Sequence, residues 1–319
     1  AIKLNPNLAD AHSNLGGVLR DLGKLDELIL VSARSLEIET LSIGDKLQAS
    51  LKMAIANLIL ENFSDAYFNI NQTIEYINLG GIQMIKNKRN RNNSMVFFKL
   101  LTVLYPKLKN KSRYLCKDKI PHFGESHCLS FSHMTIPIST NMKKIQPVLI
   151  LGAKAWHFAN QKSNQWKTSL LEQIRNHDYS DEVLISFGEI DCREKEGILY
   201  YSQKYQKNVS SVCINTINGF LDFMENALSK VYSKRFYFGV PAPTKNGINS
   251  SLDTQRKELI KTYNYFLKRE VLSRCSYFLD VFELTSDENG FNNSIYMCDE
   301  IHLDPDCLNV LFDNHLYIP

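Results

Sequence analysis

The stretch His122-Phe123-Gly124-Glu125-Ser126-His127 places a serine directly after a short apolar run. The run from Lys119 to Phe123 has the character of a strand, and Gly124 suits a tight turn after it. A serine on such a turn is presented to its surroundings instead of being packed in a core. The alternative is that Ser126 is the N-cap of a helix that starts at Cys128, because serine is favoured at that position.

Two segments far downstream contain residues that suit this serine as chemical partners. The apolar run from Val183 to Phe187 ends in Gly188-Glu189-Ile190-Asp191, and Asp299 and His302 stand three residues apart near the C-terminus. A serine hydroxyl becomes a good nucleophile when an imidazole accepts its proton, and a carboxylate on the other ring nitrogen fixes the imidazole tautomer. Serine, histidine and aspartate are therefore predicted to share one site. The competing interpretation is that His302 is a histidine of a surface loop.

Apolar runs alternate with amphipathic segments along the C-terminal part of the chain. The runs with strand character are Lys119–Phe123, Val148–Leu151, Val183–Phe187, Arg235–Val240 and Tyr277–Val281. The segments with helical periodicity between them include Asn164–Asn176, Val209–Tyr232 and Leu252–Leu272. This alternation predicts a parallel sheet covered on both faces, with ligands bound beyond the carboxyl ends of its strands.

Four short motifs occur in the order that is typical of GDSL/SGNH-type hydrolases, and residues 119–319 resemble that family. The motifs are Gly124-Glu125-Ser126, Gly152 after its strand, Gly188-Glu189-Ile190-Asp191 and Asp299-Glu300-Ile301-His302. The resemblance implies a three-layer α/β/α fold with a parallel sheet. It also implies that Ser126 is the nucleophile, His302 the base and Asp299 the acid that orients it. Backbone N–H groups of Ser126, Gly152 and Gly188 would then form the oxyanion hole.

The sequence departs from the family pattern at two positions of the predicted site. Ile190 stands where the family has its oxyanion asparagine, and an isoleucine side chain cannot donate a hydrogen bond. Glu125 replaces the usual aspartate. The residues expected to line the substrate site are Glu125, His127, Glu189, Asp191 and Arg193. Glu189 and Asp191 could instead cap the helix after the third strand.

Residues 1–39 are predicted to form two amphipathic helices. The apolar residues that recur at helical spacing in the first helix are Leu15, Val18, Leu19 and Leu22. Gly23 ends that helix where a left-handed residue is favoured. The Leu15-Gly16 pair and Asn5-Pro6 resemble the tetratricopeptide repeat, and a looser second unit spans Ile43 to Leu79. We therefore expect helical repeats over residues 1–85, in an array that begins upstream.

A basic linker and a helix are expected in residues 86–113, where lysine and arginine are frequent and no acid occurs. The start of this segment has no interleaved aromatic residues, which favours a solvated loop over a nucleic-acid-binding surface. Met95–Tyr105 is predicted to form one helix that Pro106 ends. The α/β domain then spans residues 114–319.

The composition narrows the possible partners and compartments. The chain has 319 residues and a net charge of +3, which offers no strong electrostatic case for nucleic acid. Its seven cysteines lack CxxC or metal-like spacing, so we expect a cytoplasmic protein with no metal and no other cofactor. No segment reaches the roughly 18 to 20 apolar residues that a membrane span needs.

The sequence thus predicts a serine esterase or deacylase that acts on an O-acyl ester, with an acylated carbohydrate as the preferred substrate. The helical repeats are expected to recruit a protein partner, unless they only pad the second domain. The alternative function is a hydrolase-like binding or scaffold module that lost activity with its oxyanion asparagine. Repeats also occur in protein-modifying glycosyltransferases, but the C-terminal half has no nucleotide-sugar signature.

Overall fold

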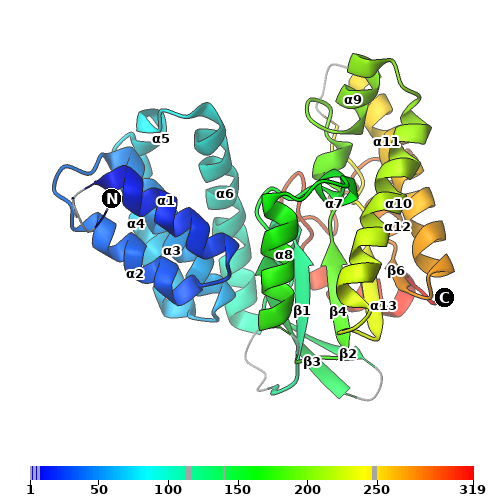
Figure 1. The fold of residues 1–319 in the computed structure, drawn as a ribbon, viewed down its shortest axis with the longest axis horizontal. Coiled ribbons are helices and arrows are strands. Elements are labelled where there is room, and N and C mark those ends of the chain that lie inside the picture. Colours follow the sequence, from blue (N-terminus) through cyan, green and yellow to red (C-terminus); the bar gives the residue numbers. More distant parts are fainter. Residues whose placement is uncertain are drawn as a thin grey trace. The chain divides into compact units, whose positions relative to one another are not determined.

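The computed structural model describes residues 2, 5, 8–111, 116–138, 141–177, 179–245 and 250–319 (Figure 1). The chain divides into two compact units, Ala1–Arg113 and Tyr114–Pro319. The first unit is helical, and the second combines helices with one sheet. The prediction of a helical segment followed by an α/β domain is therefore confirmed.

The helices of the first unit pack as successive neighbours along the chain. They are α1 (Ala9–Asp21), α2 (Leu25–Leu36), α3 (Ile43–Ile59), α4 (Phe63–Asn78), α5 (Gly81–Met84) and α6 (Lys88–Lys111). Gly16 of α1 approaches α2 so closely that a Cβ atom would lie 3.2 Å from Leu28 Cδ1. Ser42 caps α3, because its Oγ accepts the Asp45 N–H at 3.1 Å. No helix among the described residues is both long and apolar enough to cross a membrane.

Helix α6 differs from its predicted extent, because Pro106 lies inside it and does not end it. A proline in a helix interior removes one hydrogen bond and costs about 3 kcal/mol. Leu104 and Leu108, on either side of the proline, are both fully buried. Burial of both side chains offsets that cost, so the helix continues to Lys111.

Among the described residues of the second unit, seven strands form one sheet, in the order β2-β3-β1-β4-β5-β6-β7. The strands are β1 (Lys119–Gly124), β2 (Thr135–Ile138), β3 (Asn141–Leu149), β4 (Glu182–Ser186), β5 (Lys234–Phe238), β6 (Tyr277–Leu279) and β7 (Leu316–Tyr317). The five central strands are parallel, whereas β2 and β7 pair antiparallel at the two edges. The predicted parallel sheet is confirmed, and the two edge strands were not predicted.

Side chains that alternate along the strands enter two separate cores, one on each face of the sheet. In β4, Val183 and Ile185 enter the larger core and Leu184 enters the smaller one. The helices that line the larger core are α7 (Ala155–Ala159), α8 (Gln165–Asn176), α9 (Ile198–Tyr205), α10 (Val209–Leu228) and α11 (Ser250–Ser273). The short helices α12 (Val281–Thr285) and α13 (Leu308–Asn314) line the smaller one.

The strand register brings two loops to the same edge of the sheet. Gly124 at the end of β1 is paired with Ser186 of β4 and with Leu149 of β3. A Cβ atom at Gly124 would lie 2.3 Å from Ser186 Oγ, so only glycine fits between these strand ends. Ser126 and Gly188 each follow two residues later and therefore leave the sheet side by side.

We predict that Gly188→Ala destabilises the α/β unit far more than Gly152→Ala. Both glycines have positive φ, of 129° and 66° respectively, and such backbone strain costs roughly 1 to 3 kcal/mol. At Gly188 an added Cβ would also lie 2.7 to 2.9 Å from the Tyr263 ring, whereas nothing lies within 4 Å at Gly152. Urea unfolding should show a loss of about 3 kcal/mol or more for Gly188→Ala and about 1 kcal/mol for Gly152→Ala. Equal losses would contradict this packing.

Candidate active site

Ser126 is the first residue of a short 3₁₀ helix, Ser126–Leu129, that follows β1 directly. Its side chain is largely buried, with an exposed fraction of 7% for the residue. Ser126 Oγ lies 2.8 Å from His302 Nε2. The two residues are 176 positions apart, so their contact is made by the tertiary fold and not by local sequence.

Asp299 and His302 form a tight local unit in the loop that precedes Pro305. His302 Nδ1 donates to Asp299 Oδ2 at 2.8 Å, while Asp299 Oδ1 accepts the backbone N–H groups of Ile301 and His302 at 2.8 and 2.7 Å. Burial disfavours the charged carboxylate, but these hydrogen bonds and the His302 ring outweigh burial and lower the pKa of Asp299 to about 2. Asp299 is therefore ionised at neutral pH and keeps the Nδ1 proton of His302 in place.

The structure thus brings Ser126, His302 and Asp299 together in one hydrogen-bonded chain. Because Nδ1 of His302 is held as the donor to Asp299, Nε2 is free to accept the proton of Ser126. A serine, a base and an acid in this order have the arrangement that nucleophilic catalysis requires.

Glu125 and His127 form a second charged pair on the other side of the serine. Glu125 Oε1 bonds to His127 Nδ1, and His127 Nε2 lies 3.0 Å from the carbonyl oxygen of Ile301. A carbonyl only accepts, so Nε2 carries a proton. Burial opposes charge on both residues, but their mutual attraction and hydrogen bond hold the pKa of Glu125 below its ordinary value and raise that of His127. His127 is accordingly an imidazolium at neutral pH.

Ser126 Oγ is therefore held between two bases. It lies 2.7 Å from Glu125 Oε2 as well as 2.8 Å from His302 Nε2, yet the hydroxyl has a single proton to donate. When His302 is neutral, the two bases compete for that proton. When His302 is protonated, Ser126 accepts from it and donates to Glu125, so that both hydrogen bonds are made.

Glu189, at the carboxyl end of β4, is neutralised by two arginines. Arg193 Nη2 lies 2.7 Å from Glu189 Oε2, and Arg256 Nη2 of α11 lies 3.1 Å from Glu189 Oε1. Burial alone would lower the pKa of Arg193, but Glu189 raises it instead. Glu189 and Arg193 therefore form an ion pair, and Glu189 lines the same small cavity as Glu125 and His127. Arg256, 67 positions from Glu189, was not predicted.

Asp191 holds the start of another helix, α7, in place. Its two carboxylate oxygens accept the backbone N–H groups of Ala155 and Trp156, at 2.7 and 3.0 Å. Asp191 thus caps α7, which precedes β4, and not the helix that follows it. Burial, only partly offset by these hydrogen bonds, raises the pKa of Asp191 to about 6.

The expected oxyanion donors lie at the strand ends beside Ser126. Gly152 and Gly188 follow β3 and β4, the two neighbours of β1 in the sheet. The backbone N–H groups of Ser126, Gly152 and Gly188 make no hydrogen bond to another residue among those that the structure describes. Ile190 is buried and its side chain contributes no donor.

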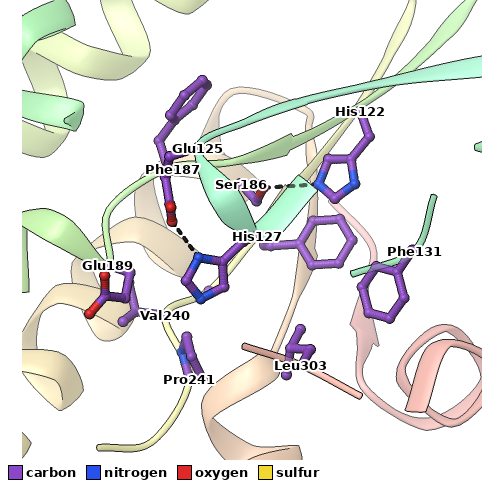
Figure 2. A pocket seen from close by; sticks show the side chains of 12 residues that line it. His122, Glu125, His127, Phe131, Ser186, Phe187, Glu189, Val240, Pro241 and Leu303 are labelled. Carbon is purple, nitrogen blue, oxygen red and sulfur yellow. Dashed lines mark hydrogen bonds and ion pairs between the residues drawn. The ribbon is translucent and has the colours of Figure 1, made fainter. Parts of the chain in front are cut away.

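A small cavity lies behind Glu125 and His127 (Figure 2). Its volume is about 20 Å³, which holds about one water molecule. His122 lines it and bonds through Nε2 to Ser186 Oγ at 2.9 Å, while its Nδ1 has no partner among the described residues. Burial, assisted by the charge on His127, lowers the pKa of His122 to about 3, so this histidine is neutral. The cavity is too small for an acyl chain, and a substrate must reach Ser126 from the solvent side.

The sequence motifs identified the three residues that the structure joins by hydrogen bonds, Ser126, His302 and Asp299, but missed several contacts around them. The Glu125 to His127 spacing of two residues was visible in the sequence and was not interpreted as an ion pair. Arg256 and His122 had no local motif to mark them. Comparisons with models of known families, with curated proteins and with solved structures yield no significant match to this chain. The functional interpretation therefore depends on the geometry of the site.

We predict that the Glu125–His127 pair makes stability depend on pH above neutrality. The pKa of His127 is raised from 6.5 to about 9, so its contribution is complete below pH 6.5 and is lost as the pH rises through 9. Urea unfolding of the intact chain should show a decline over this range, of up to about 3 kcal/mol. The Glu125→Gln/His127→Gln double variant should show a smaller decline. Parallel curves for the two proteins would contradict the charged pair.

Proposed function

We propose that the α/β unit is a serine esterase or deacylase of the GDSL/SGNH type that cleaves an O-acyl ester. One observation carries the proposal. Ser126, His302 and Asp299 form a continuous relay in which both hydrogen bonds are 2.8 Å long. If His302 were a solvated loop histidine, or if Ser126 only capped a helix, nothing would require these three side chains to be joined by hydrogen bonds.

The relay supports a two-step reaction. Ser126 Oγ attacks the acyl carbonyl carbon while His302 Nε2 takes the hydroxyl proton, and Asp299 stabilises the imidazolium that forms. His302 then gives this proton to the departing alkoxide, which leaves as an alcohol, and the acyl group remains on Ser126. In the second step His302 activates a water molecule, which releases the carboxylic acid and restores the serine.

The charges around Ser126 favour this chemistry more than the sequence suggested. Glu125 is paired with the His127 imidazolium, and Glu189 is paired with Arg193 and Arg256. The carboxylates therefore do not add uncompensated negative charge where the oxyanion develops. His127, whose ring centroid is 4.9 Å from that of His302, places a positive charge beside the reacting centre. This charge stabilises an oxyanion and so offsets part of the loss caused by Ile190, whereas it disfavours the imidazolium that forms on His302.

A binding module without turnover is the second candidate function. Ile190 supplies no side-chain donor at the oxyanion position, and loss of one such donor costs roughly 10²- to 10³-fold in rate. Glu125 also competes with His302 for the Ser126 proton. In this case the protein would bind an ester or its alcohol component and release it unchanged.

Recruitment of a protein partner by the helical unit is a separate proposal. It is supported by the repeat-like pattern of residues 1–85 and by exposed apolar side chains such as Val18 and Phe68, which are 55% and 60% exposed. Neither observation bears on the chemistry at Ser126.

We predict that the intact chain hydrolyses p-nitrophenyl acetate and that Ser126→Ala reduces the rate to background. Asp299→Asn should reduce kcat by on the order of 10³- to 10⁴-fold, because an amide stabilises the wrong tautomer of His302. Its remaining oxygen can still accept the two backbone N–H groups, so the loop should stay folded. Initial rates and thermal unfolding of the three proteins test this. Equal turnover by the intact chain and Ser126→Ala would exclude the esterase proposal, and folded protein without turnover would favour the binding module.

A further inference from the structure

A second and larger cavity lies on the α/β unit, between α7 and α9 (Ile198–Tyr205). Its volume is about 180 Å³. The residues that we call the aromatic pocket are Trp156, Tyr200, Tyr201, Lys154, Asp191 and Glu196. Trp156, Tyr200 and Tyr201 are 45%, 48% and 39% exposed, so three large ring systems face solvent around one hollow. Burial in the protein core does not account for such a cluster.

Hydrogen bonds hold the walls of this pocket in a fixed arrangement. Asp191 binds the first two N–H groups of α7 and so positions Trp156. Lys154 Nζ, at the start of α7, lies 3.2 Å from Glu196 Oε2 and connects α7 to the segment before α9. Gly197 approaches Asp191 so closely that a Cβ atom would lie 2.0 Å from its carbonyl oxygen. The pocket is therefore built before any ligand arrives, which lowers the entropic cost of binding.

A chain of ion pairs connects the aromatic pocket to the serine site. Glu189 lines the cavity beside Glu125 and His127 and pairs with Arg193 at 2.7 Å. Arg193 Nη1 lies 3.3 Å from Glu196, which in turn pairs with Lys154. An open hollow of about 380 Å³ follows the same path, lined by Glu189, Arg193 and Glu196 and also by Ile301, the residue before His302. One extended ligand can thus contact both places.

The side chains that line the aromatic pocket determine which chemical groups a ligand must have to bind there. Exposed aromatic faces bind flat apolar surfaces, and tyrosine hydroxyls, an ammonium and a carboxylate bind hydroxyl groups. Glu196 neutralises Lys154 and Asp191 is a second acid, so the pocket has no excess positive charge to bind a phosphate or a carboxylate ligand. Pockets for drug-sized molecules usually measure about 300 to 1,000 Å³, so this one holds a single small ring. A neutral sugar ring, apolar on its faces and rich in hydroxyls at its edge, meets each of these conditions.

We propose that the aromatic pocket binds one sugar ring of an O-acylated saccharide whose ester lies at Ser126. The inference rests on the proposed esterase function for the position of the ester. Saccharide binding depends only on the residues of the aromatic pocket, so the pocket can bind a saccharide without any turnover at Ser126.

The first test measures binding without catalysis, in a Ser126→Ala background. Maltotriose, cellotriose, xylotriose and chitotriose are titrated while tryptophan fluorescence is recorded, since Trp156 is one of only two tryptophans in the chain. At least one trisaccharide should change the fluorescence. Tyr200→Ala/Tyr201→Ala should weaken its binding about tenfold or more, whereas Tyr200→Phe/Tyr201→Phe, which keeps both rings, should retain most of the affinity. Tyr265→Ala removes a tyrosine on α11 outside the pocket that is more exposed than either pocket tyrosine, and it should have no effect.

The second test compares turnover of an acetylated form of that trisaccharide with turnover of p-nitrophenyl acetate. The ratio of the two kcat/KM values should fall at least tenfold in Tyr200→Ala/Tyr201→Ala and stay unchanged in Tyr265→Ala. If the unmodified chain binds a saccharide but turns over neither ester, the esterase proposal is wrong and the sugar-pocket proposal still holds. Turnover of p-nitrophenyl acetate without binding of any trisaccharide, or binding that survives loss of both tyrosines, would overturn the sugar pocket.

Discussion

The close pairing of β1 with β4 is the contact on which the site depends. Gly124 lies against Ser186 with no room for a side chain, and this register makes both strands end at the same level. Ser126 and Gly188 therefore leave the sheet together. The strand order reverses direction at β1, because β3 lies on one side of it and β4, β5 and β6 on the other. Ligand sites of open parallel sheets form at such a point, beyond the carboxyl ends of the strands.

Buried charge is the second constraint, and the structure satisfies it by pairing. Glu125 and Glu189 are buried and Asp299 is partly buried, and a carboxylate without a partner in such surroundings is costly. Each has a cationic or imidazole partner at hydrogen-bonding distance, and the partners of Glu125 and Asp299 are the two histidines whose rings face one another. The same pairs that make burial tolerable also orient His302 and place the positive charge of His127 near that ring. Under the proposed function, stability and catalysis would therefore depend on the same residues.

The parts that the sequence predicted are those with a strong local signal. Apolar runs that end in glycine marked the parallel strands, and the three-residue spacing of Asp299 and His302 allows one loop to hold both. Contacts between distant segments were missed, as in the pairing of Glu189 with Arg256 and the capping of α7 by Asp191. A proline usually ends a helix, but burial of apolar residues on both sides let α6 continue. In each of these cases tertiary packing between segments determined the structure. The sequence pattern of a single segment does not reveal such packing.

The central claim is that Ser126 is a nucleophile activated by His302, and covalent labelling tests it most directly. A fluorophosphonate reacts with an activated serine by losing fluoride and leaves a stable phosphonyl ester. We expect one adduct per chain, located on Ser126 by peptide mass spectrometry. We also expect no adduct in Ser126→Ala and labelling slower by on the order of 10²-fold or more in His302→Ala. An intact, folded chain that stays unlabelled, or labelling that persists in Ser126→Ala, would contradict the account.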